Sequence, residues 1–224
     1  MRRGLIALAV LAGLFSLVRN FPLSWTGGAL PEGVATLTGT VWNGQASQVP
    51  LLGTVSVRSS LNGIELETPP GDVTFSGTVS PRGARDLILS MPVSRVPMND
   101  ARLSGLSGRV SLRVGEARIK EGQCVSVTGT ASTNVLASNR ARFDWVGPDL
   151  SGPVDCVDGN LRVRLSGQTA QEVVSATIIT GLDGIYQSDI TVETRDVAAQ
   201  NALVLFGFAS DGEVYRLSEQ GRWR

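Results

Sequence analysis

The chain is 224 residues long, which gives room for one sizeable domain plus an anchor, the arrangement we favour, or for two small domains that share a sheet. Its 20 basic and 20 acidic residues balance, so no net positive field attracts nucleic acid, and with 42% hydrophobic residues it is too apolar to be disordered. Histidine is absent, which excludes serine triads, Cys-His dyads and ordinary zinc sites.

The N-terminal segment predicts export. Arg2 and Arg3 precede an apolar run over residues 4–18, in which Ser16 is the only polar side chain, and Arg19 follows the run. As a helix this run would be about 22 Å long, whereas the hydrocarbon core of a bilayer is about 30 Å thick. Length alone therefore favours a cleaved signal peptide.

Three features favour retention as an uncleaved anchor instead. The run ends without a pair of small residues spaced like Ala-x-Ala, Arg19 can snorkel to the interface, and Phe21 and Trp25 suit the headgroup region. We therefore expect residues 1–25 to be a signal-anchor or transmembrane segment and residues 26–224 to form an exported β domain. A cleaved signal peptide and a buried soluble helix are the alternatives.

After a Gly- and Pro-containing linker at residues 26–32, apolar and polar side chains alternate, which is the pattern of strands with one buried face. Asn-Gly and Asp-Gly pairs at 62–63, 158–159, 183–184 and 211–212 supply tight turns. The strands predicted by the alternation are Ala35–Trp42, Thr54–Ser59, Ile64–Glu67, Val73–Val79, Asp86–Pro92, Gly108–Val114, Val125–Ala131, Arg140–Trp145, Leu161–Gly167, Val173–Thr180, Tyr186–Glu193 and Glu213–Leu217.

Two segments favour helix. Residues 197–206 follow Asp196, a good N-cap, and stop before Gly207. A second, shorter helix is predicted over Pro97–Leu103, directly after a proline. The apolar stripe of the first helix is expected to contain Ala198, Ala202, Leu205 and Phe206.

The predicted fold class is mainly β. We expect one N-terminal transmembrane helix, followed by a curled, mostly antiparallel sheet of hairpins in a meander and one or two short helices. An apolar residue, Ser or Thr, and then Gly recur within several of the strands at irregular intervals, which is typical of bulges and bends rather than of a solenoid repeat. Such a sheet can curl as far as a half-barrel.

The two cysteines bear on the compartment. Cys124 and Cys156 lie at the edges of predicted strands, and an even cysteine count in an exported chain favours a disulfide between them. Two unrelated buried thiols are the alternative, as expected for a cytosolic protein.

No group of residues predicts a catalytic, cofactor-binding or metal-binding site, and we expect no enzymatic activity and no cofactor. Glu65 and Glu67 lie on one face of a predicted strand and could in principle form a carboxylate pair for an envelope hydrolase. A solvated strand face explains the same spacing, and we favour that interpretation.

The segment Leu37–Ala46 is the most unusual of the chain. It predicts a strand that presents Trp42 beside an Asn-Gly turn at Asn43 and Gly44, and a hairpin with the next strand. The indole either caps the end of the sheet or docks a partner. Trp42, Asn43 and Gly44 are therefore candidate interaction residues.

The run Gly39-Thr40-Val41-Trp42-Asn43-Gly44-Gln45-Ala46, placed about twenty residues after a basic-flanked apolar segment, resembles the type II secretion system protein N family. The C-terminal region is also similar, with an apolar helix ending at Leu205-Phe206-Gly207 and then the run Asp211–Leu217 and Gly221-Arg222-Trp223. One departure is that Arg58-Ser59-Ser60-Leu61 stands where such proteins often carry a second tryptophan.

The resemblance implies an accessory component of the type II protein secretion system. Such a protein is anchored in the bacterial inner membrane by a single segment, has its C-terminal domain in the periplasm and acts through contacts with other secretion components. The resemblance supplies no catalytic residues.

A lipid-handling periplasmic protein is the alternative function, because a curled, anchored sheet can form an apolar trough for acyl chains. Strands that are apolar on both faces would indicate such a trough, and Leu87-Ile88-Leu89 and Val173-Val174 with Ile178-Ile179 point in that direction. Arg162 and Arg164 alternate with Leu161, Val163 and Leu165 and give one polar face, which favours the secretion function.

Overall fold

The computed structural model describes residues 36–40, 42–60, 62–96, 105–181 and 183–222. The predicted anchor, the linker after it and the short helix predicted at Pro97–Leu103 lie outside these residues. Within the described part of the chain, no helix is both long enough and apolar enough to cross a membrane.

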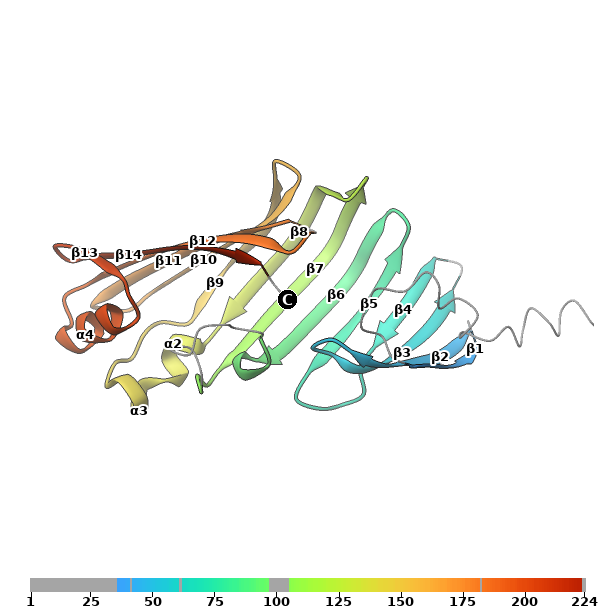
Figure 1. Cartoon of the computed structure of the whole chain (residues 1–224), viewed down its shortest axis with the longest axis horizontal. Coiled ribbons are helices and arrows are strands. Elements are labelled where there is room, and N and C mark those ends of the chain that lie inside the picture. The colour runs from blue at the N-terminus through green and yellow to red at the C-terminus, as the bar shows by residue number, and fades with distance from the viewer. Residues whose placement is uncertain (1–35, 41, 61, 97–104, 182, 223–224) are drawn as a thin grey trace, which may run out of the picture.

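The described residues form one antiparallel sheet of fourteen strands, with short helices (Figure 1). Each strand pairs with the next one along the chain up to β12, which then pairs with β14, and β13 lies outside β14. This meander confirms the antiparallel hairpins expected from the alternation, and the sheet is not closed into a barrel. The elements are β1 Thr36–Thr40, β2 Asn43–Val49, β3 Gly53–Ser60, β4 Gly63–Glu67, β5 Thr74–Ser80, β6 Gly83–Pro92, η2 Val93–Arg95, β7 Arg109–Lys120, β8 Gln123–Thr133, α2 Val135–Ser138, α3 Arg140–Phe143, β9 Leu150–Val157, β10 Asn160–Gln168, β11 Glu172–Thr180, β12 Ile185–Thr194, α4 Val197–Leu205, β13 Ala209–Asp211 and β14 Val214–Arg222.

Tight turns that contain glycine set the register of the hairpins. Val157 faces Asn160 across a two-residue turn, in which Asp158 has φ 48° and Gly159 has φ 78°. Positive φ at both positions is the geometry of the turn that matches the twist of two paired strands, and Asp-Gly favours it. The turn predicted at Asp158-Gly159 is therefore confirmed.

The strand registers place apolar side chains on one face across the sheet. Leu89 of β6 faces Leu112 of β7, and Leu112 in turn faces Ala131 of β8. On the other face Arg85 of β6 lies opposite Glu116 of β7. Because side chains of paired residues share a face, the sheet has one apolar and one polar surface over most of its width.

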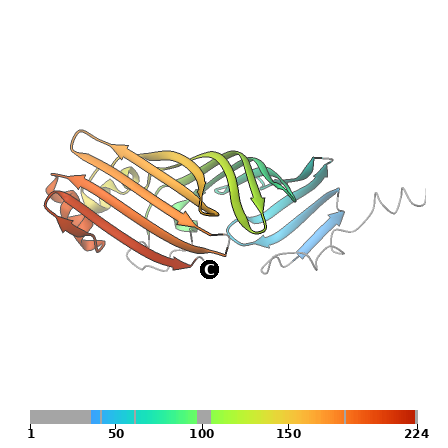
Figure 2. The same ribbon diagram turned by 90° about the horizontal axis from the view of Figure 1, so that it is seen from above.

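The sheet is bent across its width. In Figure 2 the central strands β6 to β8 lie on one side of the molecule, and β1 at one edge and β14, next to the other edge, both lie on the opposite side. Bulges between Val114 and Glu116 and between Arg118 and Ile119 add local bending. In the part of the chain that the structure describes, no second sheet lies over the apolar face, yet its side chains are half-buried, which follows if they converge on the inside of the bend.

Glycine permits this convergence at positions on the inner face. A Cβ added at Gly152 of β9 would lie 1.8 Å from the carbonyl oxygen of Arg164 on β10, and one at Gly129 of β8 would lie 2.6 Å from the carbonyl oxygen of Arg113 on β7. No side chain fits at either distance, so these strands approach closely only because glycine is present. This agrees with the bends expected from glycine within the strands.

The helices pack against one end of the inner face. Leu203 of α4 belongs to a buried cluster with Val174, Val192 and Tyr215 of β11, β12 and β14, and Leu136 of α2 packs against this cluster. Figure 1 shows α2, α3 and α4 together at the end where these strands begin or finish. Both buried clusters of the described residues therefore lie in the C-terminal half of the chain, while single core side chains such as Val55 and Met91 are buried in the N-terminal half.

The helix predicted at residues 197–206 is confirmed as α4. The Asp196 carboxylate accepts hydrogen bonds from the backbone N–H groups of Ala198 and Ala199, at 2.7 and 3.0 Å, as an N-cap does. The expected apolar stripe is wrong in part, because the helix buries Ala199, Ala202 and Leu203 and leaves Leu205 74% exposed.

The strand predicted at Arg140–Trp145 is wrong. This segment begins with the short helix α3, and Asn139 immediately before it is buried. The Asn139 side chain donates to the carbonyl oxygens of Ser107 and Val135 and accepts from the N–H of Ser107. Two of these hydrogen bonds reach backbone 32 residues away and the third reaches Val135, and together they fix the helical path here and outweigh the local alternation.

Candidate interaction site

The hairpin formed by β1 and β2 carries the first candidate site. Residues 36–40 of β1 pair with residues 43–47 of β2 without interruption, and Trp42 lies in the turn between them. Gly39 has φ 84°, and a Cβ there would lie 2.6 Å from the Asn43 carbonyl oxygen, so glycine is needed for the tight end of this hairpin. The indole of Trp42 is 45% exposed beside it.

The turn itself differs from the prediction. Asn43 and Gly44 were expected to form it, but both belong to strand β2, and the turn, which includes Trp42, lies before them because Thr40 pairs with Asn43. The N–H of Asn43 donates to the Thr40 hydroxyl at 3.2 Å, which closes the hairpin. Of the three candidate interaction residues, Trp42 and Asn43 are exposed and Gly44 is buried.

The outer edge of β1 differs from the opposite edge of the sheet. Proteins usually protect an edge strand with a charged side chain, a proline or a bulge. Strand β1, with the sequence Thr-Leu-Thr-Gly-Thr and an unshifted register, has none of these. The opposite edge strand β13 has only three residues, and its Asp211 pairs with Arg216 of β14 at 3.8 Å. Among the described strands, β1 is the less protected edge for addition of a strand from another protein.

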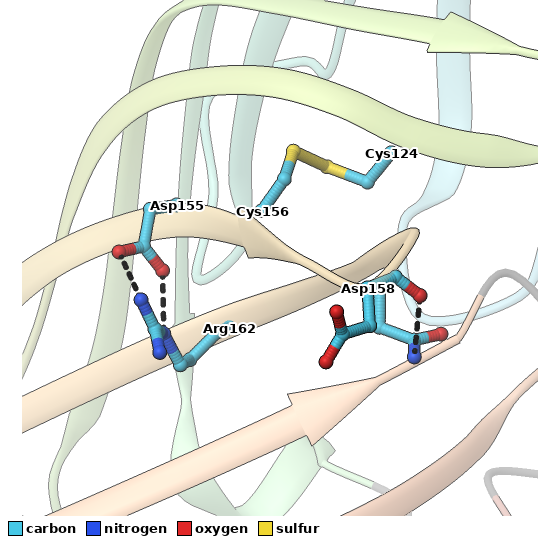
Figure 3. Close-up of a disulfide and its surroundings, with 6 residues drawn as sticks. Cys124, Asp155, Cys156, Asp158 and Arg162 are labelled. Atoms are coloured by element: carbon cyan, nitrogen blue, oxygen red, sulfur yellow. Dashed lines mark hydrogen bonds and ion pairs between the residues drawn. A yellow bond between two sulfur atoms is a disulfide. The ribbon is translucent and has the colours of Figure 1, made fainter.

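A disulfide joins Cys124 of β8 to Cys156 of β9, as expected from the even cysteine count (Figure 3). The paired residues of these two strands run only as far as Gly129 and Val154, so the disulfide holds the strands together beyond the end of their ladder. The N–H of Cys124 also donates to the carbonyl oxygen of Gly159, at 2.7 Å. The disulfide is therefore a structural clamp between neighbouring strands.

An ion-pair cluster lies one residue away on the outer face (Figure 3). Asp155 accepts two hydrogen bonds of 2.8 Å from the Arg162 guanidinium and a third of 2.8 Å from Arg164. The hydrogen bond from Arg162 is the main cause that lowers the pKa of the Asp155 carboxyl from its ordinary value. The two arginines thus tie β10 to β9 and have a bound carboxylate already.

A buried polar pair that the sequence did not indicate lies under the helices. The Trp145 indole donates a hydrogen bond to Oε1 of Glu172, and both residues are buried. Burial raises the pKa of the Glu172 carboxyl, the hydrogen bond from Trp145 lowers it in part, and the nearby Asp196 raises it further. Within the described residues Oε2 of Glu172 has no hydrogen-bond partner.

The two carboxylates of strand β4 lie on a solvated face, as expected from the sequence. Glu65 and Glu67 are both exposed on the outer face of β4, in a shallow cleft of about 320 Å³ that Arg58 and Asp86 also line. Over the part of the chain that the structure describes, no group of three or more Cys, Asp or Glu side chains is placed to hold a metal ion.

Comparison with known proteins gives one match. The sequence profile of a family described as type II secretion system (T2SS), protein N, matches residues 33–218, a span that begins just before β1 and ends within β14. No curated protein and no solved structure gives a significant match.

Proposed function

The chain belongs to the type II secretion system protein N family, and on that premise we propose that it is an accessory component of the secretion machine that works through protein contacts. The N-terminal apolar segment would hold it in the inner membrane, and the sheet would lie in the periplasm. The family match spans nearly the whole described sheet, so the proposal concerns the domain as a unit.

One observation carries the proposal of protein contacts. Strand β1 is an edge strand without charge or proline, and Trp42 lies exposed at its end. Backbone N–H and C=O groups of an edge strand can pair with a strand from a partner, and tryptophan is among the residues most enriched at the energetic centre of interfaces. The hairpin of β1 and β2 is therefore the surface we assign to a secretion partner.

The compartment and the absence of catalysis have separate support. The Cys124–Cys156 disulfide suits an oxidising compartment such as the periplasm. The lack of histidine in the sequence and the exposure of Glu65 and Glu67 favour a non-catalytic role, since a carboxylate acid needs an environment that shifts its pKa.

Site-specific photocrosslinking in living cells tests this assignment. The photoreactive residue p-benzoylphenylalanine would replace Trp42 in the full-length chain, in a bacterium that produces the secretion system. Leu51 is the matched control, because it is also 45% exposed and lies in the turn at the other end of β2. We expect secretion-system proteins among the adducts of position 42 and few at position 51. Recovery of only unrelated envelope proteins from position 42 would contradict the assignment.

A further inference from the structure

The inner face of the sheet is free of charge over most of its width. From β2 to β10, no inward position of the described strands carries a charged side chain. Six of the inward residues, from β3, β4, β6, β7, β8 and β10, are Val57, Leu66, Leu89, Leu112, Ala131 and Val163. On the outer face the same strands carry charged side chains, among them Arg85, Glu116 and Arg162.

This inner face is only partly covered. The helices pack at the end formed by β9 to β14, and no second sheet among the described residues lies over the other strands. Leu66, Leu89 and Leu112 are therefore half-buried, shielded by their neighbours on the inside of the bend rather than by another layer. A continuous apolar surface that no second layer covers usually marks a binding site.

The polarity of the surface disfavours an extended polypeptide as its occupant. The backbone N–H and C=O groups of the inner strands are used in the sheet, and the inward side chains from β2 to β10 offer few hydrogen-bonding groups. A strand or loop of a polypeptide laid along this surface would leave its own N–H and C=O groups without partners, at a cost of about 1–3 kcal/mol for each buried group. A hydrocarbon chain has no such groups and incurs no such cost.

The chain outside the structure favours a lipid as the source of that hydrocarbon. The apolar run ends at residue 18 and β1 begins at Thr36, so 17 residues, 19–35, connect them. Fully extended, 17 residues span at most about 60 Å. The membrane anchor of the proposed function, on which this step rests, would keep the sheet close to the bilayer, where acyl chains are abundant.

We propose that the inner face of the sheet is a trough that binds the acyl chains of membrane lipids. This goes beyond the proposed secretion function and uses a different surface from the β1–β2 hairpin. Such a trough does not require strands that are apolar on both faces. In a single bent sheet, one apolar face forms the trough and the polar face is in contact with water.

Neighbouring residues on opposite faces of β6 allow a matched test. The photoreactive residue p-benzoylphenylalanine would replace Leu89, which points inward, or Ile88, which points outward and is 41% exposed. Leu112 and Arg113 of β7 give a second pair in case one inward variant fails to fold. The full-length chain would be irradiated in intact cells, and the adducts identified by mass spectrometry.

We expect lipid adducts at the inward positions 89 and 112 and few or none at the outward positions 88 and 113. In the chain with the photoreactive residue at 112, Leu89→Gln should reduce the lipid adduct and Ile88→Gln should leave it unchanged. Polypeptide adducts at 89 and 112, or equal lipid labelling on both faces, would overturn the proposal. Formation of the Cys124–Cys156 disulfide, read on a non-reducing gel, reports whether each variant has folded. Crosslinks from position 42 are measured in a separate experiment. The lipid proposal and the secretion proposal can therefore be contradicted independently.

Discussion

Single glycines determine whether the strands of the inner face can approach one another. A methyl group at position 152 would lie 1.8 Å from the carbonyl oxygen of Arg164, which belongs to the backbone and cannot rotate away. Gly152→Ala should therefore lower the free energy of unfolding by about 1–3 kcal/mol, the usual cost of overpacking.

Gly115 of β7 is the control for this substitution. A Cβ there would lie 3.8 Å from its nearest neighbour, the carbonyl oxygen of Thr128, at ordinary contact distance. Gly115→Ala should change the free energy of unfolding by about 0.5 kcal/mol or less. Chemical denaturation of the full-length chain in one detergent would measure both, and equal effects would show that the close approach at Gly152 does not limit the packing.

The buried Glu172 should make stability depend on pH. Its pKa is raised in the folded state, so folding favours the protonated form, and stability falls as pH rises from about 4.3, the ordinary pKa of a glutamic acid, through the folded pKa. Glu172→Gln keeps an acceptor for the Trp145 indole and cannot ionise. The melting temperature of the variant minus that of the wild type should therefore increase between pH 4 and pH 7. A difference that is constant over this range would show that the carboxyl is not perturbed.

The sequence predicted some of these individual residues and not others. Trp42 was identified because a large indole beside a predicted turn is unusual, and it is exposed as a docking residue must be. Glu172 carried no signal, because its neighbour Trp145 comes from a segment 27 residues earlier in the chain. Only the folded structure brings the two together.

At the scale of elements, the disulfide is the strongest single restraint between two strands. It joins residues separated by 32 positions, and the chain-entropy model gives about 3.5–4 kcal/mol of stabilisation for such a loop. Reduction should therefore lower the melting temperature of the full-length chain by about 10 °C. The Cys124→Ser/Cys156→Ser variant should melt at the lower temperature with or without reductant. A variant as stable as the oxidised wild type would show that the β8–β9 ladder needs no clamp.

Helix α4 depends on its N-cap. Asp196→Ala removes the acceptor for two backbone N–H groups and should cost about 1 kcal/mol of unfolding free energy, whereas Asp196→Asn keeps a capping oxygen and should recover most of this. Denaturation of the two variants side by side checks the expectation. If both substitutions cost the same, the charge of Asp196 rather than its capping oxygen would be what stabilises the helix.

Elements with a strong local signal were predictable and those fixed by distant contacts were not. Helix α4 and the Asp158-Gly159 turn follow from capping and turn residues that lie next to one another in the chain. Strand β9 was missed because Gly152 and Pro153 in its middle lower strand propensity. The strand predicted at Arg140–Trp145 failed because Asn139 bonds to backbone 32 residues away.

At the scale of the whole molecule, the alternation predicted one antiparallel sheet with two unlike faces, and the structure has this arrangement. The direction of the bend could not be predicted, because it depends on the combined effect of bulges and glycines in several strands, and on which face of the sheet each of them lies. That direction decides whether the apolar face is an open trough or a surface that must be covered by a second layer.

Secretion of a type II substrate tests the proposed role most directly. A strain lacking the gene would be complemented with the wild-type chain, with Thr38→Lys/Trp42→Ala, which places a charge on the β1 edge and removes the indole, or with the control Leu51→Ala. We expect the substrate to stay in the periplasm of the deletion strain and of the strain with the altered β1 edge, and to reach the medium with the wild-type chain and the control. Undiminished secretion by the deletion strain would contradict the account.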